Sequence, residues 1–232
     1  MAEETVLVEK KKAVKVREPL FSKKNKKLIT DPLDENNPIT IQVLGICSAL
    51  AVTVQMKAAV VMSISVLFVL IMANVSVSLM RNLIPNRIRI IVQLVVVAAL
   101  VIIVDQVLKA YLYDVSKELA VFVGLIITNC IIMGRLEAFA LGNKVWPSAL
   151  DAIGNSIGYG MVLVVVSFFK ELFGSGKLFG IEIFGNAANG TGIYEYGYMD
   201  NGLMLLPPSS LILVAIYIWV QKMRNPTLIE TH

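Results

Sequence analysis

Residues 127–135 read Ile-Thr-Asn-Cys-Ile-Ile-Met-Gly-Arg and place a thiol, Cys130, in the middle of an apolar stretch that is short for a membrane crossing. The only other cysteine, Cys47, lies in Val-Leu-Gly-Ile-Cys-Ser-Ala-Leu, residues 43–50, near the centre of the first apolar stretch. Each half of the chain therefore carries one thiol within an apolar stretch, and the two thiols need a common explanation.

The composition is that of an integral membrane protein. Of the 232 residues, 56% are hydrophobic and only 16% are charged, which is more apolar than a soluble domain needs to build one core. A bilayer core of roughly 30 Å takes about 20 helical residues per span. Helices satisfy their own backbone hydrogen bonds where water is absent, and the alternating pattern of barrel strands is missing from this sequence. No basic segment followed directly by a short apolar core opens the sequence, so we expect no cleavable signal peptide.

Six apolar segments predict an all-α membrane domain over residues 38–221. The predicted helices cover residues 38–56, 58–80, 90–108, 119–133, 153–169 and a last segment that begins at Leu203 or Ser209 and ends at 220. A basic polar arm, residues 1–37, precedes the domain, and a polar tail, residues 222–232, follows it. A long loop, residues 171–208, is expected on the extracytoplasmic side. The arm is either a segment that lies on anionic lipid or a solvated tail.

The distribution of basic residues predicts the orientation. The chain has 21 lysine and arginine residues, and most of them fall on the side of the basic arm. Those on the opposite side of the predicted spans are Lys57, Lys109, Lys117, Lys170 and Lys177. Because cytoplasmic loops carry the excess of positive charge, we expect both termini in the cytoplasm of a multi-pass inner-membrane protein.

The order of the predicted helices suggests two inverted repeats. Three helices precede the polar turn at residues 111–118 and three follow it, and an odd number of spans reverses the second half. The first helix of each half, residues 38–56 and 119–133, has small, polar and thiol side chains at its centre. Paired interrupted segments at corresponding positions are typical of a site between inverted repeats. We therefore predict six transmembrane helices in two inverted three-helix repeats, with helices one and four interrupted near mid-membrane.

The two thiols are expected at the same depth. At 1.5 Å per residue from the ends at which their helices enter the bilayer, Cys47 and Cys130 both come out near mid-membrane. Three explanations remain open: the thiols pack as small apolar side chains, they form a disulfide, or they bind metal. Two thiolates are half of what a [2Fe–2S] cluster or a tetrahedral iron or zinc site requires, so a partner would have to bring the rest.

Other cofactor chemistry is excluded by what the sequence lacks. The only histidine is His232, the last residue, so this sequence cannot supply bis-histidine ligation to a haem. No Walker sequence and no GxGxxG after a strand is present, and nothing indicates nucleic-acid binding. Redox chemistry in this chain would have to rest on cysteine.

Five strings of residues carry a resemblance. They are Asn-Asn-Pro-Ile at 36–39, Gln-Val-Leu-Gly-Ile-Cys-Ser-Ala-Leu-Ala-Val-Thr at 42–53, Val-Asp-Gln-Val-Leu-Lys-Ala-Tyr-Leu-Tyr-Asp at 104–114, Val-Gly-Leu-Ile-Ile-Thr-Asn-Cys-Ile-Ile-Met-Gly-Arg at 123–135, and Leu-Phe-Gly-Ser-Gly-Lys-Leu-Phe-Gly at 172–180. These strings resemble the D-subunit family of the sodium-translocating NADH:quinone oxidoreductases of bacterial inner membranes. That family also includes the E subunit of the Rnf ferredoxin:NAD complex.

The resemblance implies a redox role within a complex. It implies a membrane subunit of a sodium-pumping NADH:ubiquinone reductase, a translocase in which this chain is not catalytic alone. A homologous E subunit of opposite topology would pair with it, and each would give two cysteines to one shared [2Fe–2S] cluster. Carried over to this sequence, the ligands are Cys47 and Cys130. The other partners would be the A, B, C and F subunits, which hold FAD, FMN and riboflavin, with Na⁺ and ubiquinone as substrates of the complex.

Small and polar residues near the two cysteines are candidates for supporting the cluster. A cluster held by four thiolates is anionic, and its burial is costly unless small residues bring backbone N–H groups close. The candidates are Gly45, Ser48, Thr128, Asn129 and Gly134. Each of them could equally serve helix packing alone.

Three acidic residues lie at or inside the ends of predicted spans: Asp105, Glu137 and Asp151. Carboxylates are expensive there and often mark ion pathways, and a sodium ion prefers oxygen ligands. The alternative is that they pair with basic residues such as Arg135 or Lys109, or lie exposed at the interface.

Three other functions remain open at this point. The homologous Rnf subunit would keep the fold and cysteines but take electrons from ferredoxin. A non-redox transporter with inverted repeats would use the cysteines for packing and would contain no iron. A purely structural membrane subunit would keep electron transfer when the cysteines are replaced.

Overall fold

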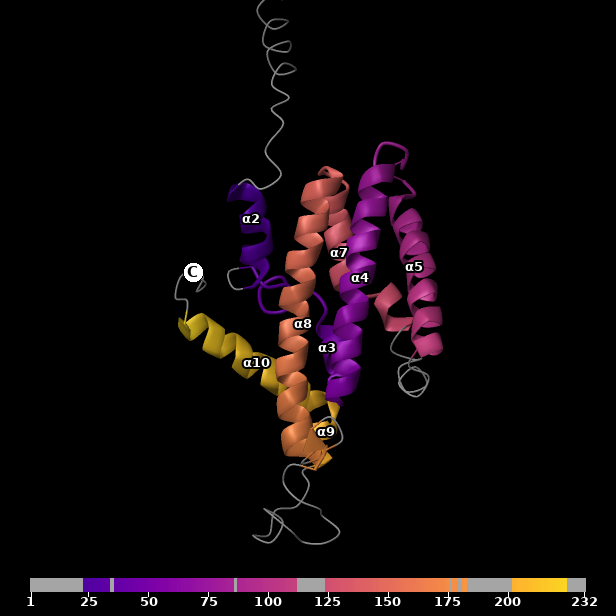
Figure 1. The fold of residues 1–232 in the computed structure, drawn as a ribbon. Coiled ribbons are helices and arrows are strands. Elements are labelled where there is room, and N and C mark those ends of the chain that lie inside the picture. The colour runs from indigo at the N-terminus through magenta and orange to yellow at the C-terminus, as the bar shows by residue number, and fades with distance from the viewer. Residues whose placement is uncertain are drawn as a thin grey trace, which may run out of the picture.

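The structure of this chain is a computed structural model that describes residues 23–33, 36–85, 87–111, 124–175, 177–178, 181–182 and 202–224, and this part is almost entirely helical (Figure 1). In chain order the elements are α2 (Lys23–Thr30), the 3₁₀ turn η1 (Asp31–Leu33), α3 (Ile46–Val52), α4 (Met56–Met80), α5 (Arg89–Tyr111), α7 (Cys130–Arg135), the π-helical turn η2 (Leu136–Ala140), α8 (Val145–Ser175), β1 (Lys177–Leu178), β2 (Ile181–Glu182), α9 (Gly202–Leu205) and α10 (Pro207–Arg224). The prediction of a helical fold is confirmed for these residues. The two short strands pair with each other as an antiparallel hairpin.

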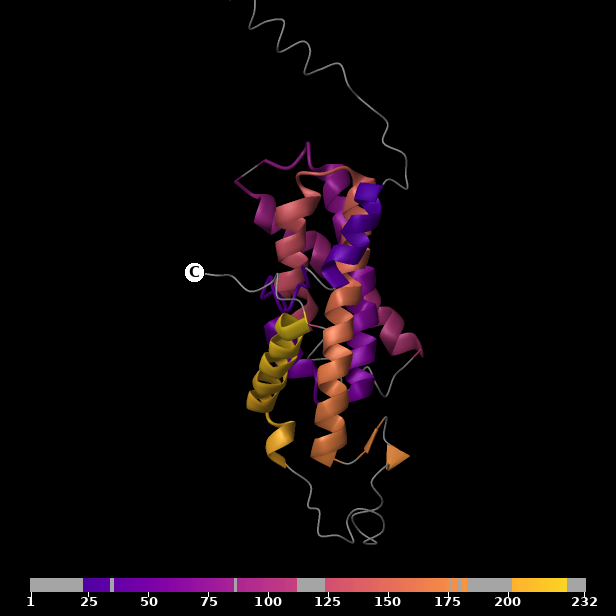
Figure 2. The ribbon, with the colours of Figure 1, turned by 90° about the vertical axis from the view of Figure 1, so that its left-hand side faces the viewer.

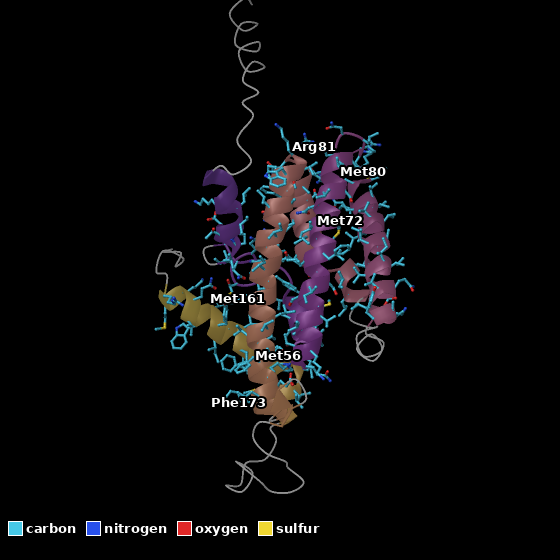
Figure 3. All side chains as sticks on the ribbon, viewed as in Figure 1. Met56, Met72, Met80, Arg81, Met161 and Phe173 are labelled. Carbon is cyan, nitrogen blue, oxygen red and sulfur yellow. The ribbon has the colours of Figure 1, made fainter. Side chains whose placement is uncertain are left out.

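The long helices α4 and α8 form the centre of the molecule. They lie side by side and run antiparallel, so that Met56 and Phe173 lie at one end and Met80 at the other (Figures 2 and 3). At Gly160 an added Cβ would lie 3.1 Å from the Cβ of Ser63, so the helices approach closely there. Their buried apolar side chains include Met62, Val66, Val69, Leu70 and Ala73 from α4 and Tyr159, Val162, Leu163 and Val166 from α8. This pair holds the core onto which the shorter elements pack.

Three helices of the described residues are long and apolar enough to cross a membrane: Met56–Met80, Arg89–Tyr111 and Val145–Gly174. The predicted helices 58–80 and 90–108 agree with α4 and α5 to within three residues. Large apolar side chains such as Ile91, Val95 and Ile102 lie exposed on α5, as expected of a helix that faces lipid. The arrangement of six spans in inverted repeats stays a prediction.

The first predicted helix, residues 38–56, is not continuous. Turns occupy residues 38–45, where Val43 has φ 57° and Gly45 has φ 86°. A residue with a side chain rarely adopts a positive φ, and each residue of an α-helix has a negative φ. The chain is therefore not helical at Val43 and Gly45. The helix begins only at Ile46 and ends at Val52, before α4 starts at Met56. The predicted boundaries were therefore wrong, although the interruption itself was expected.

The fourth predicted helix, residues 119–133, is interrupted too. Residues 124–127 are helical, Thr128 and Asn129 are not, and α7 and η2 then continue to Ala140. Residues 119–123 lie outside the described part. The prediction that the helix ends at 133 is wrong, because Arg135 and Glu137 lie within the helical segment.

The fifth predicted helix, residues 153–169, is much longer in the structure. It begins at Val145 and ends at Ser175, so Asp151 and the glycines that follow lie inside α8 and not before it. Glycine is needed here because the preceding arm packs against α8: an added Cβ at Gly154 would lie 2.7 Å from the Leu28 carbonyl oxygen, and one at Gly158 would clash with the Pro32 carbonyl oxygen. The end of the arm, including α2 and η1, is thus part of the helical fold. Residues 1–22 lie outside the described residues.

The predicted loop and tail also have different boundaries. Residues 171–175 belong to α8, and α9 and α10 cover residues 202–205 and 207–224, so the loop 171–208 is shorter at both ends. The last helix extends to Arg224, beyond the predicted start of the tail at 222. It crosses the bundle obliquely, with its far end directed away from α8 (Figure 1). Residues 183–201 and 225–232 lie outside the described part of the chain.

Candidate metal centre

Cys47 lies in the first turn of α3, directly after the positive-φ segment. Gly45 is the residue before the helix, with φ 86° and ψ 11°. An added Cβ there would lie 2.9 Å from the ring of Tyr159, so both the backbone conformation and the packing require glycine. Ser48, the residue after Cys47, is buried and donates its hydroxyl proton to the Gly45 carbonyl at 2.8 Å. The Ser48 hydrogen bond and the packing of Gly45 against Tyr159 therefore hold the segment that carries Cys47 in one conformation.

Cys130 is the first residue of α7, directly after the second interruption. Asn129 precedes it in extended conformation, with φ −67° and ψ 121°, and its side-chain oxygen accepts a hydrogen bond from the Ile131 amide at 3.3 Å. This is the usual capping arrangement for the start of a helix. Leu44 from the other interrupted segment contacts Gly134, where an added Cβ would lie 3.0 Å from its Cδ1 atom. The two interrupted segments thus pack on each other.

The structure brings the two cysteines together. The Sγ atoms of Cys47 and Cys130 lie 3.9 Å apart, although the residues are 83 positions apart in sequence. Both thiols are free and both are exposed at the surface of the chain. A disulfide requires about 2.05 Å between sulfurs, so the observed pair is not bonded.

The separation of the sulfurs fits a shared metal ion. Two thiolates at about 2.3 Å from one tetrahedral ion lie about 3.8 Å from each other. Within the described residues no group of three or more His, Cys, Asp or Glu side chains could hold a metal. The chain therefore offers two thiol ligands in tetrahedral spacing and leaves room at its surface for ligands from elsewhere.

A buried tyrosine joins the two cysteine segments. The Tyr159 hydroxyl lies 2.7 Å from the Ser48 Oγ atom, next to Cys47, and 3.4 Å from the side-chain nitrogen of Asn129, next to Cys130. Asn129 also donates to Ser48 at 3.4 Å. Sequence reasoning missed Tyr159, because a tyrosine within an apolar helix is usually part of the core. A buried hydroxyl in a predicted span, which needs a hydrogen-bond partner, was the signal available.

Of the predicted supporting residues, Gly45, Ser48 and Asn129 are buried beside the cysteines. Thr128 lies in the interruption and is exposed, and Gly134 serves the contact with Leu44.

The three acidic residues that are candidates for an ion pathway lie in separate ion pairs. Asp151 pairs with Arg135, with 2% and 14% of their side chains exposed, and Glu137 pairs with Arg89. Asp105 pairs with Lys109 one turn later, at 2.5 Å. Each carboxylate therefore has a basic partner, as the alternative interpretation expected, and nothing tests their role in ion movement.

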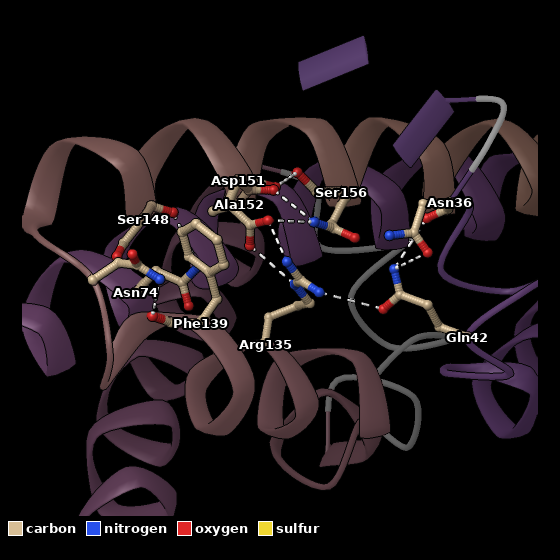
Figure 4. Close-up of polar contacts among 11 residues, drawn as sticks. Asn36, Gln42, Asn74, Arg135, Phe139, Ser148, Asp151, Ala152 and Ser156 are labelled. Carbon is tan, nitrogen blue, oxygen red and sulfur yellow. Dashed lines mark hydrogen bonds and ion pairs between the residues drawn. The ribbon is translucent and has the colours of Figure 1, made fainter. Parts of the chain in front are cut away.

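Arg135 connects the two cysteine segments to α8 (Figure 4). Its guanidinium donates to both oxygens of Asp151 and, at 3.4 Å, to the side-chain oxygen of Gln42 in the segment before Cys47. Asn155 donates a further hydrogen bond to Asp151 at 3.1 Å, and Gln42 in turn donates to the Asn36 carbonyl at 3.0 Å. This polar network ties both cysteine segments to the central helix.

Two comparisons place this chain among known proteins. A family model described as "Rnf-Nqr subunit, membrane protein" matches residues 25–218. The D subunit of the Na(+)-translocating NADH-quinone reductase of Photobacterium profundum is 53% identical over 209 residues, which cover 90% of this chain and 97% of the relative. The family match includes both cysteine segments, α8 and most of α10.

Proposed function

Because this chain belongs to the Rnf-Nqr family of membrane subunits, we propose that it is the D subunit of a Na⁺-translocating NADH:ubiquinone reductase. In this proposal Cys47 and Cys130 hold one half of an intramembrane [2Fe–2S] cluster. The observation that carries it is the 3.9 Å separation of two exposed sulfurs from distant parts of the chain. The chain then acts as part of a translocase and is not catalytic alone.

The donor set favours iron bound by thiolates. Cysteine sulfur is a soft ligand that suits iron–sulfur clusters. Each cysteine lies in the first turn of a short helix, where backbone N–H groups have no carbonyl partner within the helix. Such N–H groups lower the cost of burying an anionic centre.

A partner must supply the other two ligands. In the proposal these come from a homologous E subunit of opposite topology, whose own interrupted helices would face the exposed Cys47 and Cys130. The A, B, C and F subunits complete the complex, with FAD, FMN and riboflavin in those subunits. The same proposal includes the six-helix inverted repeat, the inner-membrane location and the cytoplasmic termini. Two repeats of opposite orientation would each present one cysteine at mid-membrane.

The residues of this chain would have three tasks. A [2Fe–2S] cluster would supply one-electron chemistry at the cysteines. Cys47 and Cys130 hold it, the Gly45 segment and Asn129 orient the two thiolates, and the Arg135 network anchors both segments to α8.

The direct test is metal content and activity of the complex. We expect Cys47→Ser and Cys130→Ser each to lose the whole cluster, about two irons and two acid-labile sulfides per complex, because a cluster with three thiolates is not retained. NADH-driven quinone reduction should be lost in parallel. Ile46→Val, a conservative change beside Cys47, is the matched control and should keep both iron and activity.

Unchanged iron and activity in the cysteine variants would contradict the proposal. The cysteines would then be ordinary packing residues, and a non-redox or structural role would take its place. Reduction of NAD⁺ by reduced ferredoxin, without NADH-driven quinone reduction, would instead indicate the Rnf relative.

A further inference from the structure

Tyr159 of the central helix α8 is hydrogen-bonded to both cysteine segments. Its side chain is fully buried. Its hydroxyl contacts Ser48, which follows Cys47, at 2.7 Å, and Asn129, which precedes Cys130, at 3.4 Å. A single hydroxyl group therefore connects the residues next to both thiols.

The direction of each hydrogen bond follows from the available protons. Ser48 has one hydroxyl proton and gives it to the Gly45 carbonyl, so its oxygen can only accept from Tyr159. Asn129 donates through its side-chain nitrogen to both hydroxyl oxygens, while its own oxygen accepts from the Ile131 amide. The Tyr159 hydroxyl thus donates to the Cys47 side and accepts from the Cys130 side, and every group has its partner.

The ring of Tyr159 makes a second contact with the same segments. An added Cβ at Gly45 would lie 2.9 Å from the ring carbon Cε2, so the ring packs directly on the left-handed residue that turns the chain into α3. Through its ring and hydroxyl, Tyr159 therefore restrains both the Cys47 segment and the Cys130 segment.

We propose that Tyr159 is a positioning residue for the metal centre, whose hydroxyl sets the spacing of the Cys47 and Cys130 thiolates by joining Ser48 to Asn129. The effect on thiol spacing is a property of this chain. Its consequence for a [2Fe–2S] cluster rests on the proposed function. A tyrosine that served packing alone would influence stability but not the metal affinity of the thiol pair.

Cadmium binding to the purified full-length chain in detergent tests the spacing without the cluster. The absorption band of cadmium–thiolate bonds counts only ions held by sulfur, and its loss in Cys47→Ser identifies binding by the pair. Tyr159→Phe keeps the ring and removes the hydroxyl, so the two thiolates are less well preorganised. We expect the affinity for Cd²⁺ to fall by about fivefold, because the net contribution of one buried hydrogen bond corresponds to about that factor in an equilibrium constant. Tyr111→Phe, at an exposed tyrosine of α5, is the matched control and should bind as the wild type does.

A double variant tests whether the effect passes through Ser48. Ser48→Ala should lower the cadmium affinity by a similar factor, and Tyr159→Phe with Ser48→Ala should lose little more than either single variant, because both remove the same hydrogen bond. Full additivity of the two losses, or a Tyr159→Phe chain that binds Cd²⁺ as tightly as the wild type, would overturn the proposal.

The intact complex tests the consequence for the cluster. In Tyr159→Phe complexes that retain iron, we expect a shifted electron paramagnetic resonance signal and a shifted midpoint potential relative to wild type and Tyr111→Phe. An unchanged signal at full iron content would overturn this consequence. A wild-type complex without iron would instead remove the proposed function, and the cadmium result would still decide whether Tyr159 positions the thiols.

Discussion

Arg135 of α7 donates hydrogen bonds to both carboxylate oxygens of Asp151, which lies 16 residues later on α8. The Asp151 side chain is 2% exposed and the Arg135 side chain 14% exposed, so the pair is largely shielded from water. Arg135 also reaches Gln42 in the segment before Cys47. One guanidinium group therefore links the Cys130 helix, the Cys47 segment and the central helix.

Removal of one member of this pair should be more harmful than removal of both. Asp151→Asn leaves the Arg135 charge buried without compensation, and we expect a loss of about 3–5 kcal/mol in stability. Arg135→Met combined with Asp151→Leu removes both charges and should be more stable than Asp151→Asn alone. Thermal unfolding of the purified chain in detergent measures the order, and a double variant that is less stable than Asp151→Asn would refute this account.

The shape of the Arg135 side chain should matter as well as its charge. Arg135→Lys keeps the charge but cannot donate in parallel to two carboxylate oxygens. We expect complexes with Arg135→Lys to assemble but to contain less iron than the wild type, because both cysteine segments are anchored less firmly. Lys144→Arg, at an exposed site between η2 and α8, is the control. The measurement is the iron content per complex. A full iron content in Arg135→Lys would show that the charge alone is sufficient to anchor the cysteine segments.

Gly45 should tolerate no side chain. Its φ of 86° is unfavourable for alanine, and an added Cβ would lie 2.9 Å from Tyr159. We expect Gly45→Ala to cost about 1–3 kcal/mol of stability and to reduce iron content. Gly124→Ala is the control, since nothing lies within 4 Å of the position its Cβ would take. Equal melting temperatures for the two variants would mean that the segment before α3 adapts to a side chain.

The parts of the fold that sequence could predict are those with a uniform signal. The long apolar runs of α4 and α5 predict their helices to within three residues. Counting helical rise from the predicted ends places Cys47 and Cys130 at the same depth, and their sulfurs lie 3.9 Å apart in the structure. Residues 38–45 are not helical, however, so the counting itself does not apply to the first segment, and the depth in the membrane stays a prediction.

The missed features depend on contacts between distant segments. The start of α8 resembles a loop in sequence, because it contains Asp151 and several glycines. The glycines are there because the backbone near Leu28 and Pro32 packs against them, and Asp151 is there because Arg135 binds it. Tyr159 was missed for the same reason, since its importance comes from contacts with both cysteine segments. None of these partners is evident from the spacing of residues along one segment.

Asp105 offers the cleanest test of an ion-pathway carboxylate. It pairs with Lys109 on the same helix, a partly exposed pair that contributes little to stability. Asp105→Asn should therefore leave the fold intact. If the carboxylate belongs to a sodium pathway, the Na⁺ concentration that gives half-maximal quinone reduction should rise. Lys109→Gln, which removes the partner but keeps the carboxylate, is the control. An unchanged sodium dependence in Asp105→Asn would remove this residue from the pathway.

Lys170 is a buried cation at the far end of α8, although the orientation argument counted it among the charges of the outer side. Its ammonium donates to the Ser210 hydroxyl at 2.8 Å, and no carboxylate of the described residues lies within ion-pairing distance. Thr53 gives its own proton to the Ala49 carbonyl, so Ser210 donates to Thr53 and accepts from Lys170.

This arrangement predicts opposite effects for the two partners. Ser210→Ala removes the acceptor and leaves a buried ammonium unsatisfied, which should cost about 1–3 kcal/mol. Lys170→Met replaces the ammonium by an apolar side chain of similar length and should be neutral or stabilising, because burial of the charge costs more than one neutral acceptor returns. Thermal unfolding of both variants and of the double variant decides. If Lys170→Met is the less stable single variant, the buried ammonium stabilises the fold and this account is wrong.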